Sequence, residues 1–320
     1  TASQNGTNYN SSTLNYLASG YNGVASGSVV DSGNTSNLVV TLSTPVTETP
    51  GGTTNPTNPT NPGFATTGNA ISSLQGLKKY SGIAPGMLDL YNASLAIDST
   101  KEANKVGEQL SPVQNSSASH VASIATFDAI GVVGQRVDAV RLAQSHGMSG
   151  VATGDDPTDW SAWGQVFGGH ANQGMVDDVS GYKANYGGLV LGLDRSLTES
   201  WQVGGALTYS YTSVRGEDNL SGNKTGVDSY GLIGYAGYTG SPWFVNLTAS
   251  VTQQRFDSTR NVDMTGYTDR ASGKFNGQQY VATAEFGYPL AIADNTRPTP
   301  LANLSYSYHT PDSYKVSSKK

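Results

Sequence analysis

Apolar and small polar residues alternate one by one along several stretches between residues 201 and 308. In the clearest of them, Trp201 and Leu207 fall on one face of an extended chain, whereas Gln202 and Thr208 fall on the other. A period of two places every apolar side chain on one surface of a sheet. The pattern therefore predicts strands, but it does not say whether the apolar surface meets a protein core or a lipid.

Seven strands are predicted from this pattern, each about nine to fourteen residues long. Strands in soluble proteins are typically about five or six residues long, whereas a tilted strand needs about nine to eleven residues to cross a bilayer. The lengths therefore favour strands that span a membrane, with a soluble β-sandwich as the alternative. The predicted strands are residues 160–170, 185–197, 201–214, 227–238, 243–256, 279–292 and 300–308.

The connections between these strands alternate in length. Residues 198–200 and 239–242 are tight turns, whereas residues 175–184, 215–226 and 257–278 are predicted to be long polar loops. Short turns on one side and long loops on the other are typical of outer-membrane barrels.

The region before the strands divides by composition. A Thr-Asn-Pro tripeptide occurs three times in succession over residues 54–62, which favours an extended polyproline spacer. Residues 1–44 are rich in Asn, Ser, Thr and Gly, which fits either a β-rich segment or a disordered arm. The predicted organisation is a β-rich segment over 1–44, a linker over 45–63, a helical region over 64–158, the strands over 159–314 and a tail over 315–320.

An amphipathic helix is predicted over residues 121–145. Val121, Ile130 and Val137 belong to a series of apolar residues at intervals of three and four, and Arg136 lies on another face. A coiled-coil or soluble bundle helix would give the same pattern.

The composition excludes several classes of protein. Charged residues make up 13% of the chain, against about a quarter in ordinary globular proteins, and there are 39 Gly and 18 Tyr. No stretch approaches the roughly 20 apolar residues of a membrane helix, so any membrane span must consist of strands. The chain has no Cys, which excludes thiol chemistry, and its net charge of −6 argues against nucleic acid as a partner.

Several motifs together resemble the β-domain of the autotransporter (type V secretion) family. The resemblance extends over roughly residues 64–314, and the order and spacing of the motifs are more specific than any one of them. The motifs are Glu108-Gln-Leu-Ser-Pro112, Trp160-Ser-Ala-Trp-Gly-Gln-Val-Phe-Gly-Gly169, Gly187-Gly-Leu-Val-Leu-Gly-Leu-Asp-Arg195, Tyr230-Gly-Leu-Ile-Gly-Tyr235, Glu285-Phe-Gly-Tyr288 and Thr299-Pro-Leu-Ala-Asn-Leu-Ser-Tyr-Ser-Tyr308.

The resemblance implies a mainly β fold, an antiparallel transmembrane β-barrel in the bacterial outer membrane with an α-helix inside its pore. About seven of an expected twelve strands are present, so the chain is expected to be a C-terminally truncated β-domain that carries the end of its passenger. The implied function is to anchor the passenger and export it to the cell surface. The implied partners are outer-membrane lipid, the chain's own passenger, the barrel-assembly machinery and periplasmic chaperones.

The resemblance also suggests which residues hold the pore helix. A plugged pore favours matched charges, and we expect Arg136 or Arg141 to pair with an inward carboxylate such as Asp194 or Glu285. Ordinary solvated charges are the alternative. The candidate residues that face the lumen or hold the helix are Asp128, Arg136, Asp138, Arg141, Asp194 and Glu285.

No catalytic or metal-binding motif is apparent in the sequence. The four His residues do not show a metal-binding spacing, and there is no nucleophile elbow or phosphate-binding loop. No adjacent Asn pair occurs, so the self-cleavage inside the barrel of one autotransporter subgroup is not expected. We therefore expect no enzyme activity, no cofactor and no metal. The alternative function is a surface adhesin whose β-rich N-terminus and loops bind host or cell-surface ligands.

Overall fold

The computed structural model describes residues 24–32, 35–43, 64–80, 84–145, 160–290, 298–312 and 317–318. The chain divides into two compact units. One comprises Thr1–Ser111 with Val262–Asp269 and the last residue, and the other comprises Pro112–Asn261 with Arg270–Lys319. The predicted linker over 45–63 lies outside the described residues.

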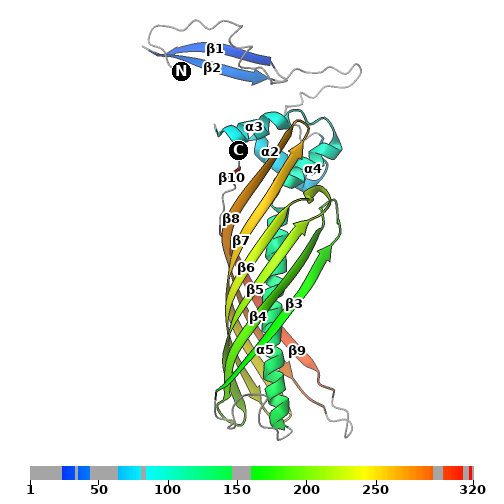
Figure 1. The fold of residues 1–320 in the computed structure, drawn as a ribbon, viewed down its shortest axis with the longest axis vertical. Helices are drawn as coiled ribbons and strands as arrows, with labels where there is room; N and C mark the ends of the chain where they lie inside the picture. Colours follow the sequence, from blue (N-terminus) through cyan, green and yellow to red (C-terminus); the bar gives the residue numbers. More distant parts are fainter. Residues whose placement is uncertain are drawn as a thin grey trace. The chain divides into compact units, whose positions relative to one another are not determined.

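The second unit is built on one antiparallel sheet in which seven long strands follow one another in chain order (Figure 1). Strand β3 pairs only with β4 and strand β9 only with β8, so the sheet is not closed within the described residues. The strands are β3 (Ser161–Gln173), β4 (Tyr182–Ser196), β5 (Trp201–Gly216), β6 (Lys224–Thr239), β7 (Phe244–Met264), β8 (Tyr267–Gly287) and β9 (Leu301–Pro311), with the short β10 (Ser317–Ser318) beside β8.

The two faces of this sheet are inverted relative to a soluble protein. The apolar residues of the alternating pattern lie on the outer face, where Leu207 is 64% exposed and Val166 and Leu304 are each 75% exposed. The residues between them face inward and are buried, among them Thr212 and Gln254, which are both fully buried. The polar face is therefore the inside of the curved sheet.

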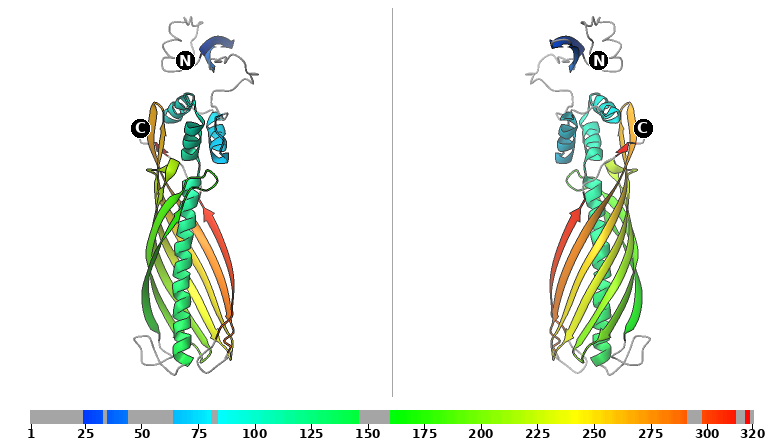
Figure 2. Two further views of the ribbon diagram at one scale, coloured as in Figure 1. Left: turned by 90° about the vertical axis from the view of Figure 1, so that its right-hand side faces the viewer. Right: turned by 90° about the vertical axis from the view of Figure 1, so that its left-hand side faces the viewer.

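Helix α5 (Val113–Ser145) runs along the strands on the concave side of the sheet (Figure 2). It contacts β3, β4, β5 and β6, and the buried apolar residues between helix and sheet form two clusters. One cluster contains Val133 and Ile233, and the other contains Val121 and Phe256. None of the helices among the described residues combines the length and apolarity needed to cross a membrane.

The first unit contains three short helices packed on the tip of the β7–β8 hairpin. The helices are α2 (Gly68–Lys78), α3 (Pro85–Ser94) and α4 (Thr100–Leu110). Leu74, Ala103 and Val106 form an apolar core with Val262 and Met264 of the hairpin tip. Further along the chain in the N-terminal direction, β1 (Val24–Ser32) and β2 (Thr35–Ser43) pair as an antiparallel hairpin.

One predicted loop is wrong. Residues 257–278 do not form a long loop, because β7 continues to Met264 and β8 begins at Tyr267. Gly266 adopts a positive φ of 77° in the tight turn between them, a conformation that glycine adopts without strain. The alternation continues through this segment, but polar residues occupy both faces, so it could not be recognised by hydrophobic pattern.

The predicted start of the long helix is also wrong. Helix α5 begins at Val113 rather than near residue 121, with the carbonyl of Pro112 accepting from the amides of Asn115 and Ser116. Its first two turns are mostly polar, so no apolar period marks them. They are held instead by the sheet, since Gln114 Nε2 donates to Thr225 Oγ1 at 2.8 Å.

Candidate functional site

The candidate site is the contact between α5 and the inner face of the sheet. Small residues on the helix permit a close approach, since Ala118, Ala122, Ala125 and Ala129 recur at intervals of three and four and are buried. Polar side chains among them reach the strands. The interface therefore combines close packing with hydrogen bonding in one surface.

A buried ion pair joins the helix to strand β4. Arg136 Nε lies 2.9 Å from Asp194 Oδ2 and its Nη2 lies 3.0 Å from Asp194 Oδ1, a bidentate arrangement. The exposed fractions of the two side chains are 9% and 3%. Tyr235 donates its hydroxyl to Asp194 Oδ2 at 3.0 Å, and Trp163 Nε1 donates to that hydroxyl at 3.0 Å. This hydrogen-bond network thus connects the helix with β3, β4 and β6.

Two glycines make room for the aromatic members of this network. Gly192 lies opposite Trp163 in the register of β3 and β4, and Gly204 lies opposite Tyr235 in that of β5 and β6. A Cβ atom at either glycine would overlap the facing ring. The glycines are required here because the facing rings fill the space that a Cβ atom would occupy.

A second polar cluster lies further along the helix. Arg141 Nη2 donates to Asp138 Oδ1 at 2.9 Å, and its guanidinium lies 3.7 Å from the ring centroid of Phe244. Asn246 Nδ2 lies 3.2 Å from Asp138 Oδ1 and 3.0 Å from Glu285 Oε1. The Asp138 side chain is 40% exposed, so this cluster is much more solvated than the first.

The last predicted residue, Asp128, accepts a hydrogen bond of 2.5 Å from the Tyr186 hydroxyl of β4. All six candidate residues therefore lie at the contact between α5 and the sheet. Of the four pairings considered from the sequence, the structure brings together Arg136 and Asp194. Arg141 instead pairs with Asp138 on its own helix, and Glu285 contacts Asn246.

Sequence reasoning missed four neutral members of these contacts, namely Trp163, Tyr186, Tyr235 and Asn246. Tyr235 lies an odd number of positions after Tyr230 and Leu232 on the same strand, so its side chain lies on the opposite face from theirs. Because Tyr230 and Leu232 lie on the outer face, this spacing is the signal that places Tyr235 on the inner face. The inward glycines Gly192 and Gly204 are a second signal, because each faces a ring across the sheet.

The outer face carries an apolar band between two groups of aromatic residues. Trp201, Tyr238, Trp243 and Phe286 contact one another in sequence near the tight turns. Tyr209 packs on Tyr230 further along the same strands. At about 3.3 Å per residue and a tilt near 40°, the two groups are roughly 20 Å apart along a barrel axis. This height matches the apolar band of an outer-membrane barrel.

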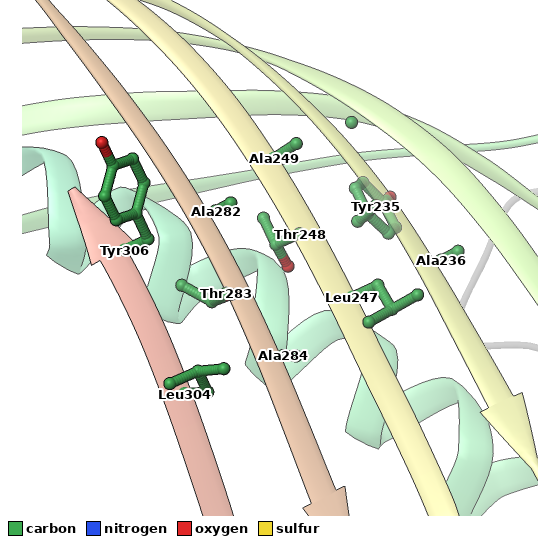
Figure 3. A pocket seen from close by; sticks show the side chains of 11 residues that line it. Tyr235, Ala236, Leu247, Thr248, Ala249, Ala282, Thr283, Ala284, Leu304 and Tyr306 are labelled. Carbon is green, nitrogen blue, oxygen red and sulfur yellow. The ribbon is translucent and has the colours of Figure 1, made fainter. Parts of the chain in front are cut away.

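Within this band the outer face contains an open apolar groove of about 580 Å³ (Figure 3). Its lining comes from β6, β7, β8 and β9, with the small residues Ala249 and Ala282 between the larger Leu247, Leu304 and Tyr306. A groove of this chemistry on an exposed sheet suits acyl chains rather than water. No group of three or more His, Cys, Asp or Glu in the described ranges is arranged to hold a metal ion.

Comparison with known families agrees with this inverted sheet. The profile of the Autotransporter beta-domain family matches residues 162–319. Residues 162–319 form an autotransporter β-domain. The match begins inside β3, so α5 and the helices α2, α3 and α4 lie outside it.

Curated proteins similar to this chain include outer-membrane proteins and an extracellular protease. Outer membrane protein A of Rickettsia conorii is 30% identical over 56% of this chain and 9% of that protein. Outer membrane protein B of Rickettsia japonica is 26% identical over 70% of this chain and 15% of that protein. The extracellular serine protease of Serratia marcescens is 27% identical over 53% of this chain and 16% of that protein. The chain thus spans a small fraction of these relatives.

Two solved structures are similar to the β-domain. The translocator domain of autotransporter NalP from Neisseria meningitidis has a TM-score of 0.41 and 19% identity, covering 59% of this chain and 61% of that one. The β-domain of the Bordetella autotransporter BrkA has a TM-score of 0.25 and 17% identity, covering 48% of this chain and 79% of that one. The family match and the outer-membrane relatives place the β-domain in the bacterial outer membrane.

Proposed function

We propose that this chain is the translocator part of a type V secretion protein, which anchors an N-terminal passenger and exports it to the cell surface. The observation that carries the proposal is the sheet that exposes its apolar face and buries its polar face around α5. A sheet of this kind is stable where lipid surrounds it and polar groups line its interior. The family match favours this function over the adhesin alternative.

In this proposal α5 is the last part of the exported chain and remains in the pore as a plug. The bidentate contact between Arg136 and Asp194 holds it there, because a buried pair resists separation unless both charges regain water. The solvated cluster around Asp138 and Arg141 contributes less, since exposed pairs are weak. We further propose that the chain itself is not an enzyme and that barrel-assembly machinery and periplasmic chaperones deliver it.

The test uses the full-length protein with an epitope tag inserted before residue 64. We expect the protein in the outer-membrane fraction, with heat-modifiable gel mobility and with the tag digested when protease is added to intact cells. Recovery of the protein in the soluble fraction, without heat-modifiable mobility, would contradict the barrel. A membrane-inserted protein whose tag resists external protease would contradict export while leaving the barrel intact.

A further inference from the structure

Three cations form a row across adjacent strands on the outer face of the β-domain. Lys183 of β4 is directly opposite Arg215 of β5, and Arg215 is directly opposite Lys224 of β6. All three residues are exposed. They share the outer face with the apolar band, because Arg215 follows Leu207 and Tyr211 at even intervals along β5.

Like charges directly opposite one another destabilise a sheet. The repulsion here is only partly relieved, since Lys183 Nζ is 2.5 Å from Glu217 Oε1. Among the described residues, the side chains of Arg215 and Lys224 form neither a hydrogen bond nor an ion pair. The chain as a whole carries a net charge of −6, so this row of cations has the opposite sign to the net charge of the chain.

The acidic residues nearby are engaged elsewhere. Asp228 accepts the hydroxyl of Tyr209, and Asp257 pairs with Lys274. Asp218 accepts from the backbone amide of Gly181. Among the described residues, no carboxylate therefore forms an ion pair with Arg215 or Lys224.

The height of the row indicates what could neutralise it. Arg215 is four residues beyond Tyr211, which is about 13 Å along the strand and roughly 10 Å along a barrel axis. Aromatic residues sit at the boundary of the hydrocarbon, and the polar headgroups follow within the next several ångströms. Lys and Arg side chains are long enough to reach back toward that layer.

We propose that Lys183, Arg215 and Lys224 bind the phosphate groups of an anionic lipid in the outer leaflet. The guanidinium of Arg215 matches phosphate in a bidentate geometry, and the two ammonium groups add point charges on either side. Acyl chains of the same lipid would lie on the apolar band below. This inference rests on the proposed function, which places this end of the strands at the cell surface.

The test measures lipid affinity with full-length protein purified from outer membranes in a zwitterionic detergent. The probe is a glucosamine-based lipid with two phosphates, compared with its dephosphorylated form and with inorganic phosphate. We expect the phosphorylated lipid to bind at least tenfold more tightly than either comparator. Equal binding of the dephosphorylated lipid would overturn the proposal, and equally tight binding of inorganic phosphate would indicate a free-anion site instead. This comparison needs no variant.

A double variant then assigns the binding to the row. Removing two cations near an anionic surface costs about fivefold in affinity for each, so Arg215→Gln with Lys224→Gln should bind the lipid about 30-fold more weakly. The exchange Arg215→Lys with Lys224→Arg should restore the affinity to within about threefold. Lys274→Gln is the matched control, because Lys274 is exposed and already paired with Asp257, and it should change the affinity less than about twofold.

Unchanged affinity in the double variant would overturn the assignment. Each variant is first located by fractionation and by protease digestion of the tag. A protein that reaches the outer membrane and exports its tag, but shows no phosphate dependence, contradicts this inference alone. A native chain that does not reach the outer membrane contradicts the proposed function.

Discussion

The two units of this chain differ in what they bury and expose: the first encloses an apolar core, whereas the second buries polar side chains beside apolar ones and exposes an apolar face. In the first unit, Leu74, Ala103 and Val106 of the helices form an apolar core with the hairpin tip. In the second unit the sheet exposes Leu207 and buries Gln254. The same hydrophobic effect explains both, because apolar side chains avoid water and the solvent around each unit differs. Whether an apolar residue is buried or exposed therefore depends on the surrounding solvent as well as on the fold.

The largest effect is expected at the buried ion pair between Arg136 and Asp194. Asp194→Asn removes the charge that balances Arg136 in a site where both side chains are almost fully buried. We expect a loss of about 3–5 kcal/mol in the free energy of unfolding, since an unpaired buried charge is costly. The measurement is the denaturant midpoint of heat-modifiable mobility in detergent micelles.

The matched control is Asp138→Asn. It removes the other carboxylate that pairs with an arginine of α5, but in a side chain that is 40% exposed. Its expected cost is below about 1 kcal/mol. Equal losses of unfolding free energy in the two variants would show that burial of the Arg136–Asp194 pair does not increase its contribution to stability.

The core of the first unit should respond as a soluble core does. Leu74→Ala removes a buried side chain, and the expected loss is about 2–5 kcal/mol in the stability of that unit. Hydrogen exchange in the full-length protein should rise in α2 and α4 and stay unchanged in β4 to β6. A rise of hydrogen exchange in β4 to β6 as well would contradict the expectation that the two units have separate cores.

On the outer face of the sheet, a charged substitution at an exposed apolar residue should be destabilising. Leu207→Arg places a charge within the apolar band, where a lipid surround costs up to about 2–4 kcal/mol. A water-exposed site would tolerate it within about 0.5 kcal/mol. Met87→Arg in α3 is the control, because Met87 is also exposed but belongs to the first unit. The yield of folded protein in the outer-membrane fraction distinguishes the two outcomes.

The smallest expected effect is a pH dependence of the hairpin tip. The hydrogen bond from Lys105 at 2.6 Å lowers the pKa of the Asp263 carboxyl below its usual range, with Thr268 adding a second bond. A lowered pKa in the folded state stabilises the folded protein above about pH 4, and the contribution disappears as the pH falls through the folded value.

Hydrogen exchange of the first unit should therefore rise slightly more in acid for the native chain than for Asp263→Asn. The difference should be small, because Asp263 is 53% exposed. An identical pH profile in the two proteins would show that this ion pair does not stabilise the tip.

The sequence predicted all seven strands and the existence of the long helix, because both depend on local periodicity. It did not predict the extension of β7 and β8 to Met264 and Tyr267, since polar residues on both faces hide a period of two. It also missed the start of α5 at Val113, whose first turns are polar and are stabilised by the sheet. In each case the missing information is a contact with a distant segment.

The sequence by itself determined which residues share a face of each strand, because alternation is a property of the extended backbone. It also led us to expect that Arg136 or Arg141 of α5 pairs with an inward carboxylate, with ordinary solvated charges as the alternative. Only the tertiary structure decided that Asp194 is the partner of Arg136, since the two are 58 residues apart and meet through the curvature of the sheet. The tertiary structure also decided that Tyr235 faces inward and that the apolar face of the sheet lies outside. Alternation along a strand shows which side chains share a face, but it does not show whether that face meets lipid, water or another part of the protein.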